Sequence, residues 1–132
     1  LVIAILLAIT VPSFLGAQEK AKDKDAQANL QIAVVTEEIL RSEDRLYSED
    51  LVALAKEEPS VVFELDVAGP VATGRVYVNV APPDGRLYLS ARSEGGECFY
   101  LRSIPVGTGG PIRARDTSCD PASTQTYSVD AW

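Results

Sequence analysis

The chain has 132 residues and a formal net charge of −7, and its acidic balance argues against general affinity for nucleic acids, which requires a basic surface. This length provides material for one domain. The chain contains no histidine and only two cysteines, so the commonest general base is absent and the cysteines alone cannot complete a four-ligand zinc site. We therefore expect a protein that is not an enzyme and that holds no metal or cofactor.

The chain opens with the run LVIAILLAITV, in which every residue but Thr10 is apolar. As a helix, Leu1–Leu15 covers about 22 Å, whereas a membrane span needs about 30 Å. No basic segment precedes the run, and Leu15 is a poor match for a signal-peptidase site, so we expect a retained stem rather than a cleaved signal peptide. Because no methionine is present, we expect the stem to continue upstream, where about ten further apolar residues would complete a span.

Pro12 and Gly16 interrupt this helical pattern, and they predict a kink or a locally unwound segment around residues 10–16. An amphipathic helix then continues to about Leu46, so residues 1–46 form a hydrophobic stem and helix. Its apolar residues recur at spacings of three and four and make one stripe: Phe14, Ala17, Ala21, Ala28, Ile32, Val35 and Ile39. We expect the alanine-rich half of this stripe to pack against other helices and the bulky half to cover the sheet of the head.

Residues 47–132 are expected to form a β-rich head. Ser48 is a suitable N-cap for a short helix, Glu49–Glu57, that Pro59 closes. Alternating apolar residues then predict strands at 61–67, 75–80 and 86–91. After the turn at Gly95-Gly96, residues 98–103 are expected to form a fourth strand, whose buried face the pattern does not identify. The resulting prediction is an α+β fold, in which a long N-terminal helix packs on a four-stranded antiparallel sheet and the chain after Ile104 is loop-like.

Side-chain pairings follow from the same patterns. Glu37 and Arg41 are placed to form an i,i+4 ion pair on the long helix. Glu64 and Asp66 are expected to point outward from the first strand as a solvated face. Alternation also places Tyr77 and Tyr88 on the exposed face of the sheet, as subunit contacts or sheet packing.

Cys98 and Cys119 both lie in the turn-rich second half of the chain. In an exported protein, two cysteines indicate one disulfide, worth roughly 3 kcal/mol for a loop of this size in the chain-entropy model. A reduced pair in the cytosol is the alternative, which the hydrophobic start disfavours. The last residues, Tyr127–Trp132, are expected to return as an edge segment.

The residues IAILLAITVPSFLGAQEKAKDKDAQANLQIAV resemble the N-terminal helix of bacterial type IV pilins, above all at the step Val11-Pro12-Ser13-Phe14-Leu15-Gly16. For the head, the similarity is one of architecture. The resemblance implies a structural subunit of an extracellular helical filament of identical subunits. Before assembly, such a subunit sits in the cytoplasmic membrane and engages the pilus assembly machinery. Adhesion, surface motility or DNA uptake would be its biological roles, with no direct nucleic-acid contact by this subunit.

The resemblance also assigns residues. It makes the apolar residues of the first segment the core helix of the filament: Leu1, Val2, Ile3, Ile5, Leu6, Leu7, Ile9 and Val11. It makes Pro12 and Gly16 the bounds of a segment that can lose helical structure in a filament, and it assigns Cys98 and Cys119 to the bond of the C-terminal loop. The resemblance would place the family's peptidase site and assembly glutamate upstream of Leu1, so neither is assigned to a residue of this sequence.

Two other functions remain open from the sequence. A pseudopilin of a type II secretion system shares the helix and often holds calcium in the loop after the sheet. Four acids could contribute oxygens here, although their spacing matches no calcium-loop pattern: Glu94, Glu97, Asp116 and Asp120. A membrane-anchored binding module would instead use Arg102, Arg113 and Arg115 as an anion site, against the simpler expectation that they pair with Asp116 or a neighbouring subunit.

Overall fold

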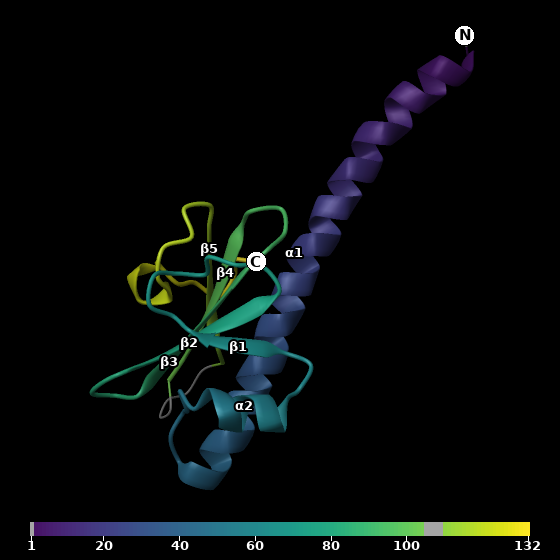
Figure 1. The fold of residues 1–132 in the computed structure, drawn as a ribbon. Coiled ribbons are helices and arrows are strands. Elements are labelled where there is room, and N and C mark those ends of the chain that lie inside the picture. Colours follow the sequence, from purple (N-terminus) through teal and green to yellow (C-terminus); the bar gives the residue numbers. More distant parts are fainter. Residues whose placement is uncertain (1, 105–109) are drawn as a thin grey trace.

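The computed structural model describes residues 2–104 and 110–132, with side chains described from Phe14 onward (Figure 1). One long helix, α1, packs along a twisted sheet and extends well beyond it at its N-terminal end. The elements are α1 (Val2–Asp44), α2 (Leu51–Glu57), β1 (Val62–Leu65), β2 (Arg75–Ala81), β3 (Arg86–Arg92), β4 (Cys98–Ser103), β5 (Ile112–Asp116) and a short 3₁₀ turn, η1 (Ala122–Thr124).

Helix α1 runs without interruption through Pro12 and Gly16. The unwound segment expected there is therefore absent from the isolated chain. Proline removes only one backbone donor, and the helical turns on either side of it retain theirs. Loss of helical structure at this point in an assembled filament stays a prediction. The helix ends at Asp44, slightly earlier than expected, where Arg45 takes a positive φ of 65°.

The sheet has five strands in the order β1-β2-β3-β4-β5, and it is mixed. Strands β2 to β5 pair antiparallel, but β1 pairs parallel to β2, with Val62 beside Arg75 and Leu65 beside Val78. The prediction of four antiparallel strands is therefore wrong, although the α+β class is confirmed. After β1 the chain returns along residues 66–74 to the end of the sheet where β1 began, so β2 starts in the same direction as β1.

Strand β5 was expected to be loop, and its sequence explains why. Ile112-Arg113-Ala114-Arg115-Asp116 carries arginines at the positions that face α1, where the other strands carry valine, leucine or phenylalanine. Aromatic rings take the place of aliphatic packing here. The guanidinium carbon of Arg113 lies 4.8 Å from the ring centre of Trp132, and that of Arg115 lies 6.0 Å from the ring centre of Phe99.

The main hydrophobic core lies between the sheet and the two helices. Alternate residues of the central strands point into it, among them Val76, Val78, Leu87, Leu89, Phe99 and Leu101. Helix α2 contributes the fully buried Leu54. Its N-cap is Asp50 rather than the expected Ser48, since Asp50 Oδ1 accepts hydrogen bonds from the backbone N–H groups of Val52 at 3.0 Å and Ala53 at 3.2 Å.

The opposite face of the sheet is also covered. The C-terminal segment around η1, yellow in Figure 1, lies on the side away from α1 and forms a second apolar cluster with Tyr88, Cys98, Tyr100 and Ala114. Tyr77 and Tyr88 are therefore 3% and 7% exposed, and the expectation that they face solvent is wrong. A pattern of alternation identifies the two faces of a strand, but it does not reveal that a later segment will fold over the second one.

Asp66, expected to be solvated, is buried where the loop after β1 meets the C-terminal segment. Its Oδ1 accepts a hydrogen bond from Gly69 N at 2.9 Å, and its Oδ2 accepts one from Ala122 N at 3.0 Å. The hydroxyl of Ser90 donates to the same Oδ2 at 3.5 Å. One carboxylate thus joins β3 to two connections that are distant in sequence. Glu64, on β1 itself, does lie at the surface, in an ion pair with Arg75.

The chain end returns to the sheet as expected. Ser128 and Arg113 exchange backbone hydrogen bonds of 2.7 and 2.8 Å, which form an antiparallel bridge on the outer edge of β5. Trp132 then packs edge-on against Phe99, with ring centres 5.7 Å apart, and its indole N–H donates to Ala114 O at 2.9 Å.

Replacing Asp66 by alanine is expected to destabilise the head by about 3 kcal/mol, because two buried backbone N–H groups lose a charged acceptor. Glu64→Ala is the matched control, since an exposed ion pair contributes no more than about 1 kcal/mol. Urea unfolding followed by tyrosine and tryptophan fluorescence measures both. Equal losses in the two variants would contradict the role assigned to Asp66.

Candidate functional site

Helix α1 has two apolar faces on nearly opposite sides. The inner face packs on the sheet and comprises Ala26, Leu30, Ala33, Val34 and Leu40. The outer face is the stripe identified in the sequence, and it is exposed: Phe14 is 63%, Ile32 38%, Val35 58% and Ile39 41% accessible. The bulky half of the stripe therefore does not cover the sheet as expected, because the residues between its members do so instead.

The bulky half of the outer stripe borders a hollow. This hollow has a volume of about 390 Å³ and is lined by Gln31, Ile32, Val35, Thr36, Ile39, Glu57 and Glu58, so that α2 forms its far wall. Its lining surface is mostly apolar, and it also includes the two glutamates. An exposed aliphatic ridge beside an apolar hollow is the kind of surface that marks a contact site on a protein.

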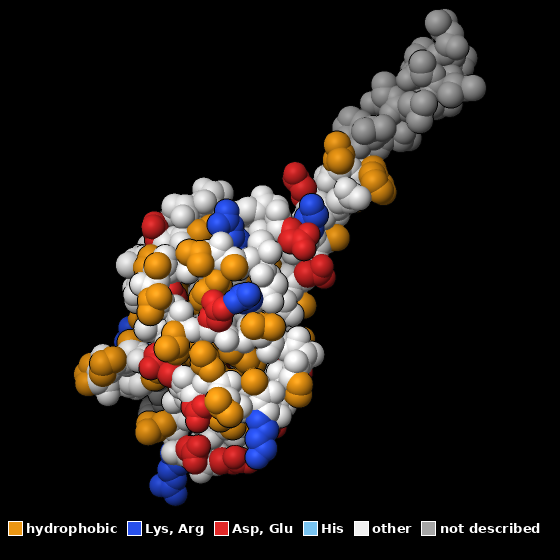
Figure 2. Space-filling model, viewed as in Figure 1, with side chains coloured by type: hydrophobic (Ala, Val, Ile, Leu, Met, Phe, Trp, Pro, Cys, Tyr) orange, Lys and Arg blue, Asp and Glu red, His pale blue; other side chains and the backbone are white. Residues whose placement is uncertain are grey.

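The alanine-rich half of the stripe lies where α1 leaves the head. All side chains from Phe14 to Ala21 are exposed, and Figure 2 shows apolar side chains gathered on this part of the helix, just before the charged segment. Farther along the helix, Asp23 Oδ1 accepts a hydrogen bond of 2.6 Å from Ser93 Oγ in the turn between β3 and β4. The part of α1 before Asp23 thus projects from the head, and its apolar side chains from Phe14 onward are uncovered.

The connection between α1 and α2 encloses a buried acid. Glu37 is fully buried, and its Oε2 accepts a hydrogen bond from Ser48 N at 3.0 Å, while its Oε1 has no hydrogen-bond partner among the described residues. The loss of hydration raises the pKa of Glu37 to about 7; the Ser48 bond lowers the pKa and nearby Glu38 and Glu49 raise it further.

The ion pair expected between Glu37 and Arg41 is replaced. Arg41 binds Glu38 at 2.7 Å, and the other oxygen of Glu38 accepts a 2.6 Å hydrogen bond from the hydroxyl of Tyr47. Tyr47 Oη also lies 2.8 Å from Ser103 Oγ on β4. The helix rotation that sends Glu37 inward thus places Glu38 where it ties the end of α1 to the sheet.

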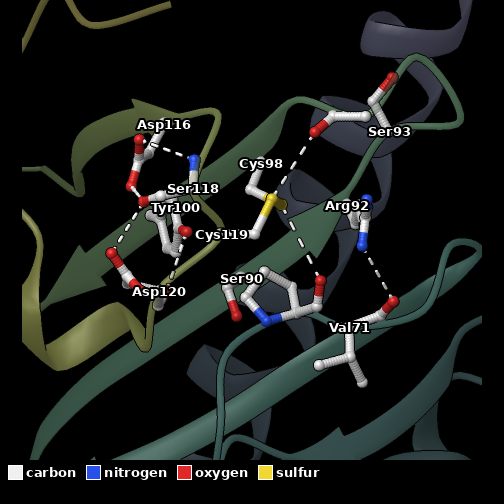
Figure 3. Close-up of a disulfide and its surroundings, with 12 residues drawn as sticks. Val71, Ser90, Arg92, Ser93, Cys98, Tyr100, Asp116, Ser118, Cys119 and Asp120 are labelled. Carbon is white, nitrogen blue, oxygen red and sulfur yellow. Dashed lines mark hydrogen bonds between the residues drawn. A yellow bond between two sulfur atoms is a disulfide. The ribbon is translucent and has the colours of Figure 1, made fainter.

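The structure confirms the disulfide. Cys98 at the start of β4 is bonded to Cys119, with their Cα atoms 5.3 Å apart, and the bond pins the segment after β5 to the sheet (Figure 3). Next to it, Tyr100 donates a hydrogen bond to Asp120 O at 2.9 Å. These contacts fix the position of the C-terminal segment.

The three arginines considered for an anion site do not converge. Arg113 and Arg115 lie on the α1 side of the sheet, whereas Arg102 lies on the other side, over the ring of Tyr127 at 5.0 Å. Arg115 forms an ion pair with Glu97 at 2.6 Å rather than with Asp116. Arg113 pairs with Leu101 and therefore shares its face of the sheet, whereas a pleated strand sends the next residue, Arg102, to the opposite face. The three arginines therefore cannot form a single patch.

Of the four acids considered for calcium, Asp116 and Asp120 lie close together, because both are within hydrogen-bonding distance of the Ser118 hydroxyl, as Figure 3 shows. Glu97 is instead paired with Arg115, and Glu94 lies in the turn between β3 and β4. Within the described parts of the chain, no three histidine, cysteine, aspartate or glutamate side chains come together as a metal site would require.

The predicted core residues of the stem, Leu1–Val11, lie outside the residues whose side chains the structure describes, and Leu1 is undescribed altogether. Among the described residues, no helix is both long enough and apolar enough to cross a membrane.

Comparison with known proteins found no match: no protein-family model, curated protein or solved structure matches the chain.

Glu37 makes the stability of the head depend on pH. Its pKa is about 7 in the folded protein and about 4.5 as an unperturbed group, so the folded state holds the proton more tightly. This contribution is complete below pH 4.5 and is lost as the pH rises through 7. The difference amounts to about 3 kcal/mol, at about 1.36 kcal/mol for each pKa unit.

Urea unfolding between pH 4.5 and 8 measures this dependence. Glu37→Gln is expected to remove most of the decline, because the amide imitates the protonated acid. Glu43→Gln, an exposed position on the same helix, serves as the control and should leave the decline intact. A decline of the same size in Glu37→Gln would show that another group is responsible.

Proposed function

We propose that this protein is a structural subunit of an extracellular filament of the type IV pilus kind and that it assembles through α1. The proposal rests chiefly on one observation, the uncovered apolar stripe on the outer face of a helix whose inner face is already used by the head. Exposed apolar patches of this kind mark interaction sites on soluble proteins.

The projecting stem supports the same function. Before assembly, its apolar residues would hold the subunit in the cytoplasmic membrane; on assembly, they would move into a bundle of identical helices. Both surroundings are apolar, so close packing and the shielding of backbone polar groups, more than the hydrophobic effect, would favour the bundle. Contacts between different surfaces of successive copies do not close on themselves, and they generate an open filament.

The head is suited to the outside of such a filament. Its disulfide is stable in an oxidising environment outside the cell. Its net negative charge keeps it soluble. Extension or retraction would be driven by separate ATPases of the assembly machinery, since the sequence has no phosphate-binding loop. Adhesion, motility or DNA uptake would then be properties of the whole filament.

Electron cryomicroscopy of material sheared from cells that make the protein tests this function. We expect thin filaments with a central bundle of helices surrounded by heads. Val35→Ser with Ile39→Ser should abolish the filaments while changing the unfolding free energy of the head by less than about 0.5 kcal/mol, because both side chains are exposed.

Val67→Ser is the matched control for these variants. Val67 is 86% exposed, lies just after β1 rather than on α1, and should leave the filaments unchanged. If the native protein stays in the membrane fraction and forms no filaments, the assembly function is rejected, and an anchored subunit that acts singly takes its place.

A further inference from the structure

The two halves of the outer stripe repeat the same spacing. The same number of residues separates Phe14 from Ile32, Ala17 from Val35 and Ala21 from Ile39, and this separation is called here the stripe interval. It equals about five complete turns of an α-helix, or roughly 18 residues at about 3.6 residues per turn. The two halves therefore lie on the same side of the helix.

The two halves also differ in size in a complementary way. In the three matched pairs, the members from the second half are all β-branched and form a ridge. Two of the three members from the first half are alanines, and the side chains of both halves are exposed. Alanine lets a neighbouring helix approach closely, whereas a ridge of bulky residues needs small residues opposite it. Phe14 is the exception in the first half, and the 390 Å³ hollow beside Ile32 provides the space for its ring.

Charges beside the stripe favour one orientation. Lys24 flanks the stripe on one side and Glu43 flanks it on the other, and both are exposed. Consider two such helices that run parallel with their stripes facing each other, one displaced by the stripe interval. Glu43 of one copy then lies at the same height along the axis as Lys24 of the other copy, and both lie on the same side of the contact. In an antiparallel arrangement, each flank meets its own counterpart, and these two charges are not brought together.

We propose that α1 helices of two copies pack in parallel through the outer stripe, displaced by the stripe interval, so that Ile32, Val35 and Ile39 of one copy cover Phe14, Ala17 and Ala21 of the next. The displacement corresponds to about 27 Å along the axis, at about 1.5 Å per residue. Each copy presents both halves, so it contacts one neighbour through each half. The two neighbours are displaced in opposite directions along the axis, and the series continues without closure. This inference rests on the proposed filament function and specifies the register of its central contact.

Cysteine cross-linking tests the register. Ala21→Cys with Ile39→Cys places one thiol at each end of a predicted contact, and Cys98 and Cys119 remain bonded to each other. The two new thiols are about 27 Å apart within one helix. They therefore cannot bridge within one chain, because a disulfide requires Cα atoms within about 7 Å. Sheared filaments are treated with a mild oxidant and dissolved without reductant, and the covalent multimers are separated by size.

We expect a ladder of dimers, trimers and longer multimers from this variant. Ala21→Cys with Ile32→Cys is the matched control, because both positions are exposed on the same stripe but would face each other only if the two helices ran antiparallel. We expect this variant to give no covalent multimers. Ala17→Cys with Val35→Cys repeats the test in the proposed register if the first variant does not assemble.

The outcomes separate this inference from the function on which it rests. Filaments without cross-links in either proposed pair, or a ladder from the control pair, would overturn the register and leave the filament function standing. Absence of filaments in the native protein would reject the function, and the register with it.

Discussion

The burial of the inner face of α1 against the sheet is the contact on which the remaining structure depends. A helix presents one apolar stripe to the sheet that it covers, and the residues of that stripe here include Leu30 and Ala33, both without exposed surface. Once these residues face the sheet, helix geometry forces Val35 and Ile39 to the outside. The exposed stripe is therefore not a flaw in the packing of the head but the consequence of a helix with apolar residues on both sides.

Two buried acids, each at a connection between elements of the head, differ in how fully their carboxylates are hydrogen-bonded. Asp66 has three donors, from Gly69, Ala122 and Ser90, so its charge is compensated where the loop after β1 meets the C-terminal segment. Glu37 has one, the backbone N–H of Ser48, and its second oxygen has no hydrogen-bond partner among the described residues. A compensated carboxylate stabilises a fold, whereas a carboxylate with half of its hydrogen-bonding capacity unused is costly when charged. The connection between α1 and α2 is thus a part of the head whose stability depends on pH.

The C-terminal third of the chain completes the head from the side opposite α1. The disulfide and Asp66 hold the segment after β5 over Tyr88 and Tyr100, and the last residues return along the edge of β5. This cover removes the second face of the sheet from solvent. It leaves an exposed apolar stripe on the outer side of α1, which is why the functional proposal centres on the helix rather than on the head.

The sequence by itself determined the elements whose signals are local. Alternation located three of the strands, and the turn at Gly95-Gly96 preceded the fourth. Spacing located the long helix and its apolar stripe, a polar cap and Pro59 located the short helix, and the cysteine count indicated the disulfide. The tertiary structure alone decided which apolar residues of α1 face the sheet, because the helix carries two apolar faces and spacing does not rank them. It also decided the parallel pairing of β1, since strand direction depends on how the loop at 66–74 crosses the sheet.

Contacts between distant segments account for the remaining differences. The burial of Asp66, Tyr77 and Tyr88 depends on the segment around η1, which comes much later in the chain. Strand β5 exists because β4 offers an edge on which a segment with two arginines can pair. Such contacts leave no periodic trace in the residues that make them, so only the folded chain reveals them.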